Sequence, residues 1–97
     1  MAYIPDNDAL NGLLRTEGYD FTGNILDAWM LVEEMGNHFH ELVRHCHASK
    51  HKVWWEVRTL ETLSSRPQNF SADTPATAIC AAYWGTRPIG GFSGDTT

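Results

Sequence analysis

The hydrophobic pattern of this chain changes its period along the sequence, and this change restricts the fold more than any other feature. In TGNILDAWMLVEEMGN (residues 22–37), apolar residues recur at helical spacing, on a stripe made of Ile25, Ala28, Trp29 and Val32. In KVWWEVRTL (residues 52–60), apolar and polar residues largely alternate, and β-branched and aromatic side chains are frequent, as in a strand. Residues 71–85 return to a helical pattern. The order predicts an α+β fold.

Three helices are predicted, each with residues near its ends that suit a helix terminus. The candidate N-terminal caps are Asp6 or Asp8 for residues 6–18, Thr22 or Asn24 for residues 22–37, and Asp73 or Thr74 for residues 71–85. The glycines that can end these helices are Gly18, Gly36 and Gly85. Pro75 suits the first turn of the third helix, where its missing N–H costs nothing.

Each helix also has a face that can be buried. The first presents Leu10, Leu13 and Leu14, and the third presents Ala76, Ile79, Cys80 and Tyr83. In the second helix, Leu26, Met30 and Leu31 lie beyond the main stripe, so this helix is apolar over more than one face. We expect it to be sandwiched between other elements rather than to meet a partner. The same breadth is compatible with a homodimer, and the sequence leaves the oligomeric state open.

Residues 38–46 and 52–60 predict a β-hairpin whose turn is the polar segment HASKHK. One face of its second strand is apolar, and the other carries Trp54, Glu56 and Arg58. A third, short strand is expected around Phe70. The small antiparallel sheet then packs against or between the helices in one domain, residues 1–85. A mobile Gly-rich tail is expected over residues 86–97.

The charges divide the chain into an acidic body and a mildly basic hairpin. The formal net charge is −5. Residues 38–58 hold four basic against two acidic side chains, so this segment carries +2 and the remainder −7. Direct nucleic-acid binding is not expected, because phosphate affinity needs clustered Lys and Arg. An acidic body is better suited to a basic protein surface.

The two cysteines, Cys46 and Cys80, are expected to be free thiols in a reducing compartment. The N-terminal segment MAYIPDNDAL has neither the cationic nor the apolar part of a signal peptide. No stretch approaches the roughly 20 apolar residues of a membrane span. These features predict a cytoplasmic protein with no membrane association.

Five histidines and one cysteine fall within residues 38–51, which raises the question of a metal site. On a strand, His38 and His40 share one face. His45 and His47 share the other face, so one straight strand cannot present all four to a single ion. The spacing also matches no zinc-finger or ribbon pattern. We therefore expect polar hairpin residues, with no metal and no cofactor.

Catalysis has little support, and a non-enzymatic protein is predicted. The chain has neither a nucleophile elbow nor a phosphate-binding loop. Cys46 lies between two histidines, but adjacent strand residues point to opposite faces, so the pairing is unsuitable for a nucleophile and its base. Cys80 lies on an apolar helix face, where a cysteine usually serves as a small core residue.

Trp54 is the best candidate anchor of a protein interface, because it lies among charges on its strand. The predicted protein-interaction residues are Trp54, Glu56 and Arg58 together with Met30, Glu33 and Glu34 of the second helix. A second interpretation has equal support: the second helix covers this face, and both Trp54 and Trp55 belong to the core.

Several segments follow one another in a recognisable order. They are Asn24-Ile-Leu-Asp-Ala-Trp29, Val32-Glu33-Glu34-Met35, the Trp54-Trp55 strand, and Ala72-Asp73-Thr74 followed by Ala78-Ile79-Cys80-x-Ala82. Over residues 19–84 the chain thereby resembles the small phage and prophage proteins of the phage ABA-sandwich domain family. The His-rich hairpin and the Gly-rich tail depart from the family pattern. The resemblance implies a phage origin and a fold, but it does not imply a biochemical activity.

The leading hypothesis is a small phage protein that binds a host protein and inhibits a bacterial defence complex, such as a CRISPR effector. An alternative is a small-ligand sponge, in which a dimer holds a nucleotide signal. The residues proposed for that ligand are Arg44, Lys50, Lys52, Arg58 and Trp54. A third interpretation is a regulatory or virion-assembly protein with no role in defence.

Overall fold

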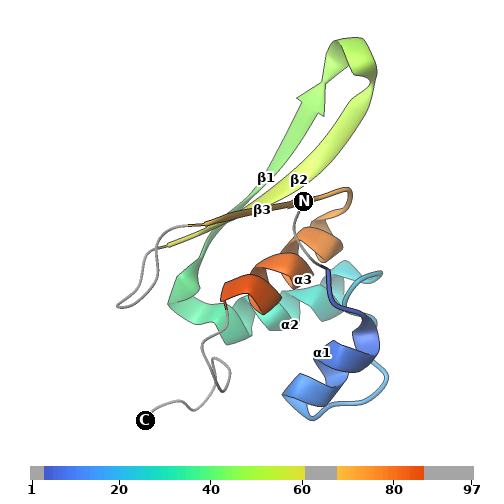
Figure 1. The fold of residues 1–97 in the computed structure, drawn as a ribbon, viewed down its shortest axis with the longest axis vertical. Coiled ribbons are helices and arrows are strands. Elements are labelled where there is room, and N and C mark those ends of the chain that lie inside the picture. Colours follow the sequence, from blue (N-terminus) through green and yellow to red (C-terminus); the bar gives the residue numbers. More distant parts are fainter. Residues whose placement is uncertain (1–3, 61–67, 87–97) are drawn as a thin grey trace.

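The computed structural model describes residues 4–60 and 68–86, which form helices and a three-stranded antiparallel sheet (Figure 1). The elements are α1 (Asn7–Leu14), α2 (Ile25–Met35), a 3₁₀ turn (Gly36–His38), β1 (Phe39–His47), a 3₁₀ turn (Ala48–Lys50), β2 (Lys52–Thr59), β3 (Asn69–Ala72) and α3 (Pro75–Thr86). The strand order is β1-β2-β3. The predicted α+β fold, the hairpin and the short third strand are confirmed. Of the predicted tail, Thr86 still belongs to α3, and residues 87–97 lie outside the described residues.

Helix α1 begins as predicted and ends earlier than predicted. The Asp6 carboxylate accepts a hydrogen bond from the backbone N–H of Ala9 at 2.8 Å, which makes Asp6 the cap. The helix ends at Leu14 and not at Gly18, and the residue that caps its C-terminus, Arg15, has a left-handed backbone (φ 59°). Asn11 explains the early end, because its side chain accepts from the Thr16 hydroxyl and donates to the Tyr19 carbonyl. These bonds draw the following loop back onto the helix.

Helix α2 is capped by Asn24, whose side-chain oxygen accepts from the backbone N–H groups of Leu26 and Asp27. The residues that it buries are Ala28, Leu31 and Met35. Of the predicted stripe, Ala28 is buried and Val32 packs against the core, but the prediction was wrong for Ile25 and Trp29, which are 41% and 45% exposed. In a helix that is apolar over most of its circumference, spacing alone does not decide which face is buried.

Helix α3, and not α2, is the sandwiched helix. It packs against β2 and β3 on one side and against α2 on another. Seven of its twelve residues are buried, four of them alanines (Ala76, Ala78, Ile79, Cys80, Ala81, Ala82, Tyr83). Its start is capped by Thr74, whose hydroxyl oxygen accepts from the Thr77 N–H. The alanines have small side chains, so the sheet and α2 can both approach this helix closely.

Gly85 has a packing role that sequence reasoning missed. The helix continues one residue beyond it, so Gly85 does not end α3. A Cβ atom at this position would collide with the ring of Phe70 on β3. The missing side chain therefore lets the last turn of α3 lie against the sheet.

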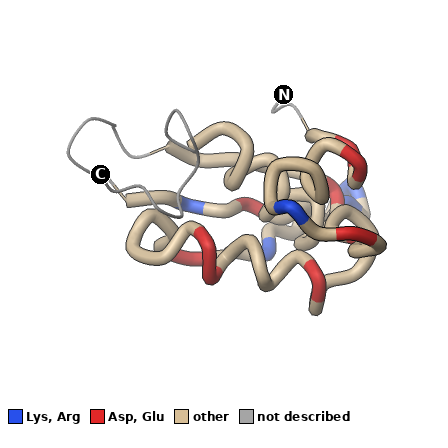
Figure 2. The backbone as a smooth tube through the Cα atoms, turned by 90° about the horizontal axis from the view of Figure 1, so that it is seen from below, with Lys and Arg blue, Asp and Glu red and all other residues tan. Residues whose placement is uncertain are grey.

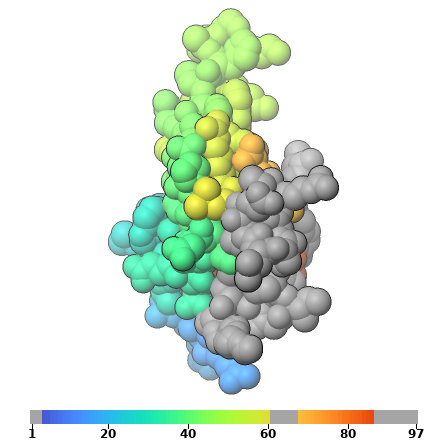
Figure 3. Space-filling model, turned by 90° about the vertical axis from the view of Figure 1, so that its left-hand side faces the viewer, coloured from blue at the N-terminus to red at the C-terminus, as the bar shows by residue number. Residues whose placement is uncertain are grey.

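The two faces of the sheet have different surroundings. The inner face packs against the helical core through Phe39, Leu42, Trp55, Val57, Phe70 and Ala72. The outer face carries Glu41, His45, Trp54, Glu56 and Arg58, and none of these belongs to that core. The β1–β2 hairpin also extends beyond the helices, so its tip stands clear of the rest of the molecule (Figures 1 and 3). Residues near this tip are exposed on both faces.

Candidate binding surfaces

A connected set of polar side chains lies on the outer face of the sheet. Arg58 donates from Nη1 to Glu41 Oε2 at 2.8 Å and from Nε to Glu56 Oε1 at 3.3 Å. Glu56 Oε1 also accepts from His45 Nε2 at 2.8 Å. The His45 ring in turn stacks on Trp54 across the two strands. Four successive contacts, three of them across the two strands, thus link Trp54 to Glu41.

These contacts stabilise the charged forms of Glu56 and Arg58. The hydrogen bond from His45 lowers the pKa of the Glu56 carboxyl, against the effect of its burial, and the neighbouring Arg58 lowers it further. The hydrogen bond to Glu41 raises the pKa of Arg58. Because Arg58 already contacts two carboxylates, it is not available as a cation for a ligand. The predicted ligand-binding role of Arg58 is therefore not supported by the geometry.

Trp54 lies on the outer face, and no described helix covers it. Its neighbour Trp55 is the tryptophan that packs against the core. The interpretation in which α2 covers the Trp54 face was wrong, because α2 lies on the other side of the sheet, beyond α3. Helix α3 covers the inner face, and α2 packs against α3.

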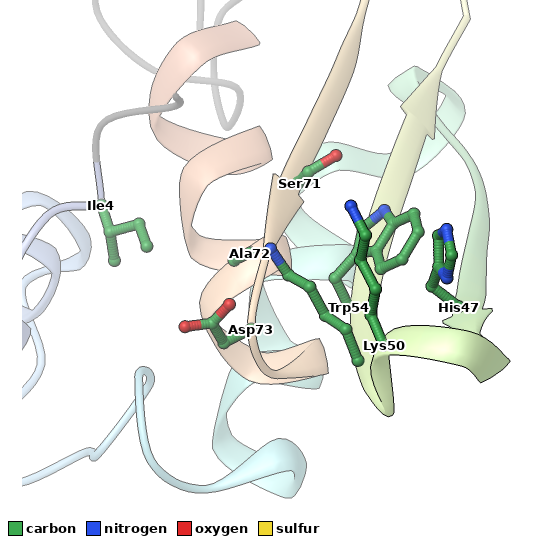
Figure 4. A pocket seen from close by; sticks show the side chains of 8 residues that line it. Ile4, His47, Lys50, Trp54, Ser71, Ala72 and Asp73 are labelled. Carbon is green, nitrogen blue, oxygen red and sulfur yellow. The ribbon is translucent and has the colours of Figure 1, made fainter.

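A groove of about 530 Å³ lies beside Trp54, and we call it the Trp54 groove (Figure 4). The hairpin contributes His47, Lys50, Lys52 and Trp54 to its lining. The other side is formed by Ile4 and by the end of β3 and the bend that follows, Ser71, Ala72 and Asp73. Its volume falls within the range of roughly 300–1,000 Å³ that is usual for small-molecule sites.

The groove gathers three of the five residues predicted for a ligand site. Trp54, Lys50 and Lys52 line it, whereas Arg58 is held by two carboxylates and Arg44 is paired with Trp55 in the register of the hairpin, on the inner side of the sheet. Arg44 and Arg58 therefore do not line this groove. Sequence reasoning missed Ile4, Ser71 and Asp73, because no local pattern indicates that these residues meet the hairpin.

A second surface lies on α2, and we call its four exposed residues, Ile25, Leu26, Trp29 and Glu33, the α2 surface. Leu26 is 79% exposed, which is unusual for so large an apolar side chain in a helix. Trp29 makes an edge contact with Phe39, and the ring centroids are 6.0 Å apart. Sequence reasoning had assigned Ile25 and Trp29 to the core, so it missed their exposure.

The predicted protein-interaction residues do not form one surface. Trp54, Glu56 and Arg58 lie on the outer face of the sheet, and the α2 residues lie on its helical side. Met30 is half-buried against the core. Glu34 is also half-buried, and its buried Oε1 atom has no hydrogen-bond partner among residues 4–60 and 68–86. Of the three α2 residues that were predicted, only Glu33 is exposed.

The histidines and cysteines of the described residues do not form a metal cluster. Within residues 4–60 and 68–86, no three His, Cys, Asp or Glu side chains are arranged to hold one metal ion. His45 bonds Glu56, and His47 bonds the Ser49 hydroxyl at 3.0 Å. Cys80 is buried and donates its thiol to the Phe21 carbonyl, and desolvation raises its pKa to about 12. Cys46 is exposed near the hairpin tip.

No family model, curated protein or solved structure matches the chain. Within the part of the chain that the structure describes, none of the helices has the length and apolar character needed to span a bilayer.

Proposed function

We propose that the chain is a non-enzymatic phage protein that binds a basic surface of a bacterial defence complex, such as a CRISPR effector, and inhibits it in the host cytoplasm. The main observation behind this proposal is the α2 surface, where three large apolar side chains are exposed beside acidic residues. The phage origin rests on the resemblance of residues 19–84 to the phage ABA-sandwich domain family.

The exposed apolar residues support a protein partner. Ile25, Leu26 and Trp29 are neighbours on the first turns of α2, and each is at least 41% exposed. Adjacent exposed residues of this size form an apolar patch, and such patches commonly mark protein interfaces. Tryptophan in particular is enriched among the residues that dominate binding energy. A partner that covered this patch would remove its apolar area from water.

The charge around the patch supports a basic partner. Residues 4–35 contain seven acidic side chains and one basic side chain, Arg15 (acidic: Asp6, Asp8, Glu17, Asp20, Asp27, Glu33, Glu34). Helix α2 itself has three acidic residues and no basic residue, and Figure 2 shows acidic positions along the helices. Proteins that bind nucleic acids present Lys and Arg on the surface that meets phosphate. An acidic protein can occupy such a surface and thereby exclude the nucleic acid.

The test compares variants of the α2 surface in binding and in inhibition of a purified defence complex. Leu26→Glu and Glu33→Lys should each weaken binding by at least tenfold, because one removes an apolar contact and the other reverses a charge at the interface. Both positions are exposed, so the fold should be retained, and circular dichroism checks this. Glu34 is unsuitable for the test, because its half-buried carboxylate makes a charge reversal destabilising.

Matched controls locate the interface. Glu17→Lys makes the same charge change as Glu33→Lys at an exposed position outside α2, and it should have a smaller effect. Trp54→Ala changes the opposite side of the molecule and should leave binding unchanged. If Trp54→Ala abolishes binding and the α2 variants do not, the interface is the outer face of the sheet. If all of the variants inhibit as well as the wild-type chain, neither surface is the interface.

A further inference from the structure

We propose that the Trp54 groove binds a nucleotide, by stacking its base on Trp54 and pairing its phosphate with Lys50 and Lys52. This inference concerns a different surface from the α2 surface and does not depend on the protein partner.

The register of the sheet explains why one side of Trp54 is open. The last residue of β3, Ala72, pairs with Trp55. A longer β3 would place its next residue beside Trp54, but the chain bends at Asp73 and enters α3 at Pro75. On the β1 side, His45 stacks on the indole with the ring planes 11° apart. The groove therefore occupies the position that a strand neighbour would fill, and a planar ring placed there could stack on the Trp54–His45 pair.

The cations of the groove support an anionic ligand. Lys50 and Lys52 are exposed, and neither forms an ion pair within the described residues. Both line the same groove as Trp54, and Figure 4 shows Lys50 beside the Trp54 indole. Two ammonium groups provide six N–H donors, which suits the oxygens of a phosphate group. His47 lines the same side of the groove.

The remaining polar groups favour a nucleotide over a simpler anion. Asp73 is the one acidic residue of the lining, and it and Ser71 belong to the β3 side of the groove, across from the hairpin. A carboxylate accepts hydrogen bonds from sugar hydroxyl or base amino groups, but it repels phosphate. Inorganic phosphate would leave Trp54 and Asp73 unused, and a neutral aromatic compound would leave the two lysines unused.

A small nucleotide fits better than a nucleic-acid strand. On the outer face of the sheet next to the groove, Glu41 and Glu56 both contact Arg58, so this cation is already engaged and does not extend the positive charge of the groove. Residues 4–35 are also strongly acidic. Sequence-independent strand binding needs a continuous positive track, which the described residues do not provide.

Isothermal titration calorimetry at low salt tests this proposal. The probes are the four ribonucleoside monophosphates and cyclic dinucleotides, with the nucleosides, inorganic phosphate and a short oligonucleotide as comparisons. At least one nucleotide should bind saturably, and its parent nucleoside and inorganic phosphate should bind at least tenfold more weakly. The absence of saturable nucleotide binding up to about 1 mM would overturn the proposal. Tighter binding of the oligonucleotide would also overturn it.

Variants of the hairpin assign the binding to the groove. Trp54→Ala should weaken nucleotide binding by about tenfold or more, and Trp54→Phe should retain most of the affinity because it keeps a stacking ring. Lys50→Gln and Lys52→Gln should each weaken it several-fold. Arg44→Gln removes a cation of the same hairpin on the other sheet face and is the matched control. If Arg44→Gln lost as much nucleotide affinity as the two lysine variants, the binding would be nonspecific electrostatic attraction, and the proposed site would be wrong.

The two proposals can fail separately. Leu26→Glu on the α2 surface should leave nucleotide binding unchanged, because it lies on the other side of the sheet. Conversely, Lys50→Gln and Lys52→Gln should leave the protein interaction unchanged.

Discussion

Trp54 stacks on His45 across the hairpin, with ring centroids 5.1 Å apart and ring planes 11° apart. The same His45 ring donates a hydrogen bond to Glu56, so one imidazole both supports the indole and orders a carboxylate. This relationship connects the Trp54 groove to the charged network of the outer sheet face. Because Glu56 is part of this network, the pH dependence of protein stability can report on it.

Replacing Glu56 should cost stability only where its carboxyl is ionised. The pKa of Glu56 is lowered below 4.5 in the folded protein by the His45 hydrogen bond and by Arg58. A lowered folded-state pKa stabilises the protein above pH 4.5, and this stability is lost as the pH falls through the folded-state value. Glu56→Gln should therefore reduce the free energy of unfolding by about 0.5–1 kcal/mol at pH 7. The difference should vanish in acid.

Urea unfolding at a series of pH values measures this difference. Glu17→Gln is the control, because Glu17 is exposed and should show little effect at any pH. A Glu56→Gln deficit that stays constant from neutral to acid pH would contradict the role given to the ionised carboxylate.

Two glycine substitutions should change stability in opposite directions. Gly12 lies within α1, and a Cβ atom there would meet nothing within 4 Å, so Gly12→Ala should stabilise the protein by about 0.5–1 kcal/mol. In Gly85→Ala the new methyl group collides with Phe70, and we expect a loss of about 1–3 kcal/mol despite the better helix propensity. Thermal unfolding of both variants provides the comparison. Two stabilised variants would mean that Phe70 moves aside without cost.

The Asn24 cap should be needed for the stability of α2. Asn24→Ala removes the acceptor of two backbone N–H groups, and we expect it to lower the free energy of unfolding by about 1 kcal/mol. Asn24→Asp keeps a capping oxygen and should recover most of that loss. Chemical denaturation distinguishes the two variants. If Asn24→Ala and Asn24→Asp lost the same free energy of unfolding, the Asn24 amide would contribute something other than a hydrogen-bond acceptor.

The two thiols should differ strongly in reactivity. Cys46 is exposed, whereas Cys80 is buried with a pKa of about 12. A thiol-specific reagent at pH 8 should therefore modify one thiol of the folded protein quickly and the second only after denaturation, because the thiolate is the reactive form. Cys46→Ser should remove the fast reaction. Rapid labelling of both thiols in the folded state would show that the core around Cys80 opens readily.

The positions of the elements could be predicted from the sequence, because the signals for them are local. Asp6, Asn24 and Thr74 cap helices through hydrogen bonds to residues two or three positions away. The alternation of KVWWEVRTL likewise indicates a strand with one apolar face. The sequence alone was therefore sufficient for the α+β class, for the hairpin and for placing Trp54 and Trp55 on opposite faces of their strand, but it left open whether both belong to the core.

Only the tertiary structure decided which surfaces are free. Helix α2 could have buried any of several faces, and in its packing against α3 it buries Ala28, Leu31 and Met35, which leaves Leu26 exposed. The Trp54 groove exists because β3 stops at the residue opposite Trp55, where Ser71 and Asp73 meet the hairpin. These outcomes depend on contacts between residues far apart in the chain, and such contacts leave no periodic pattern in the sequence.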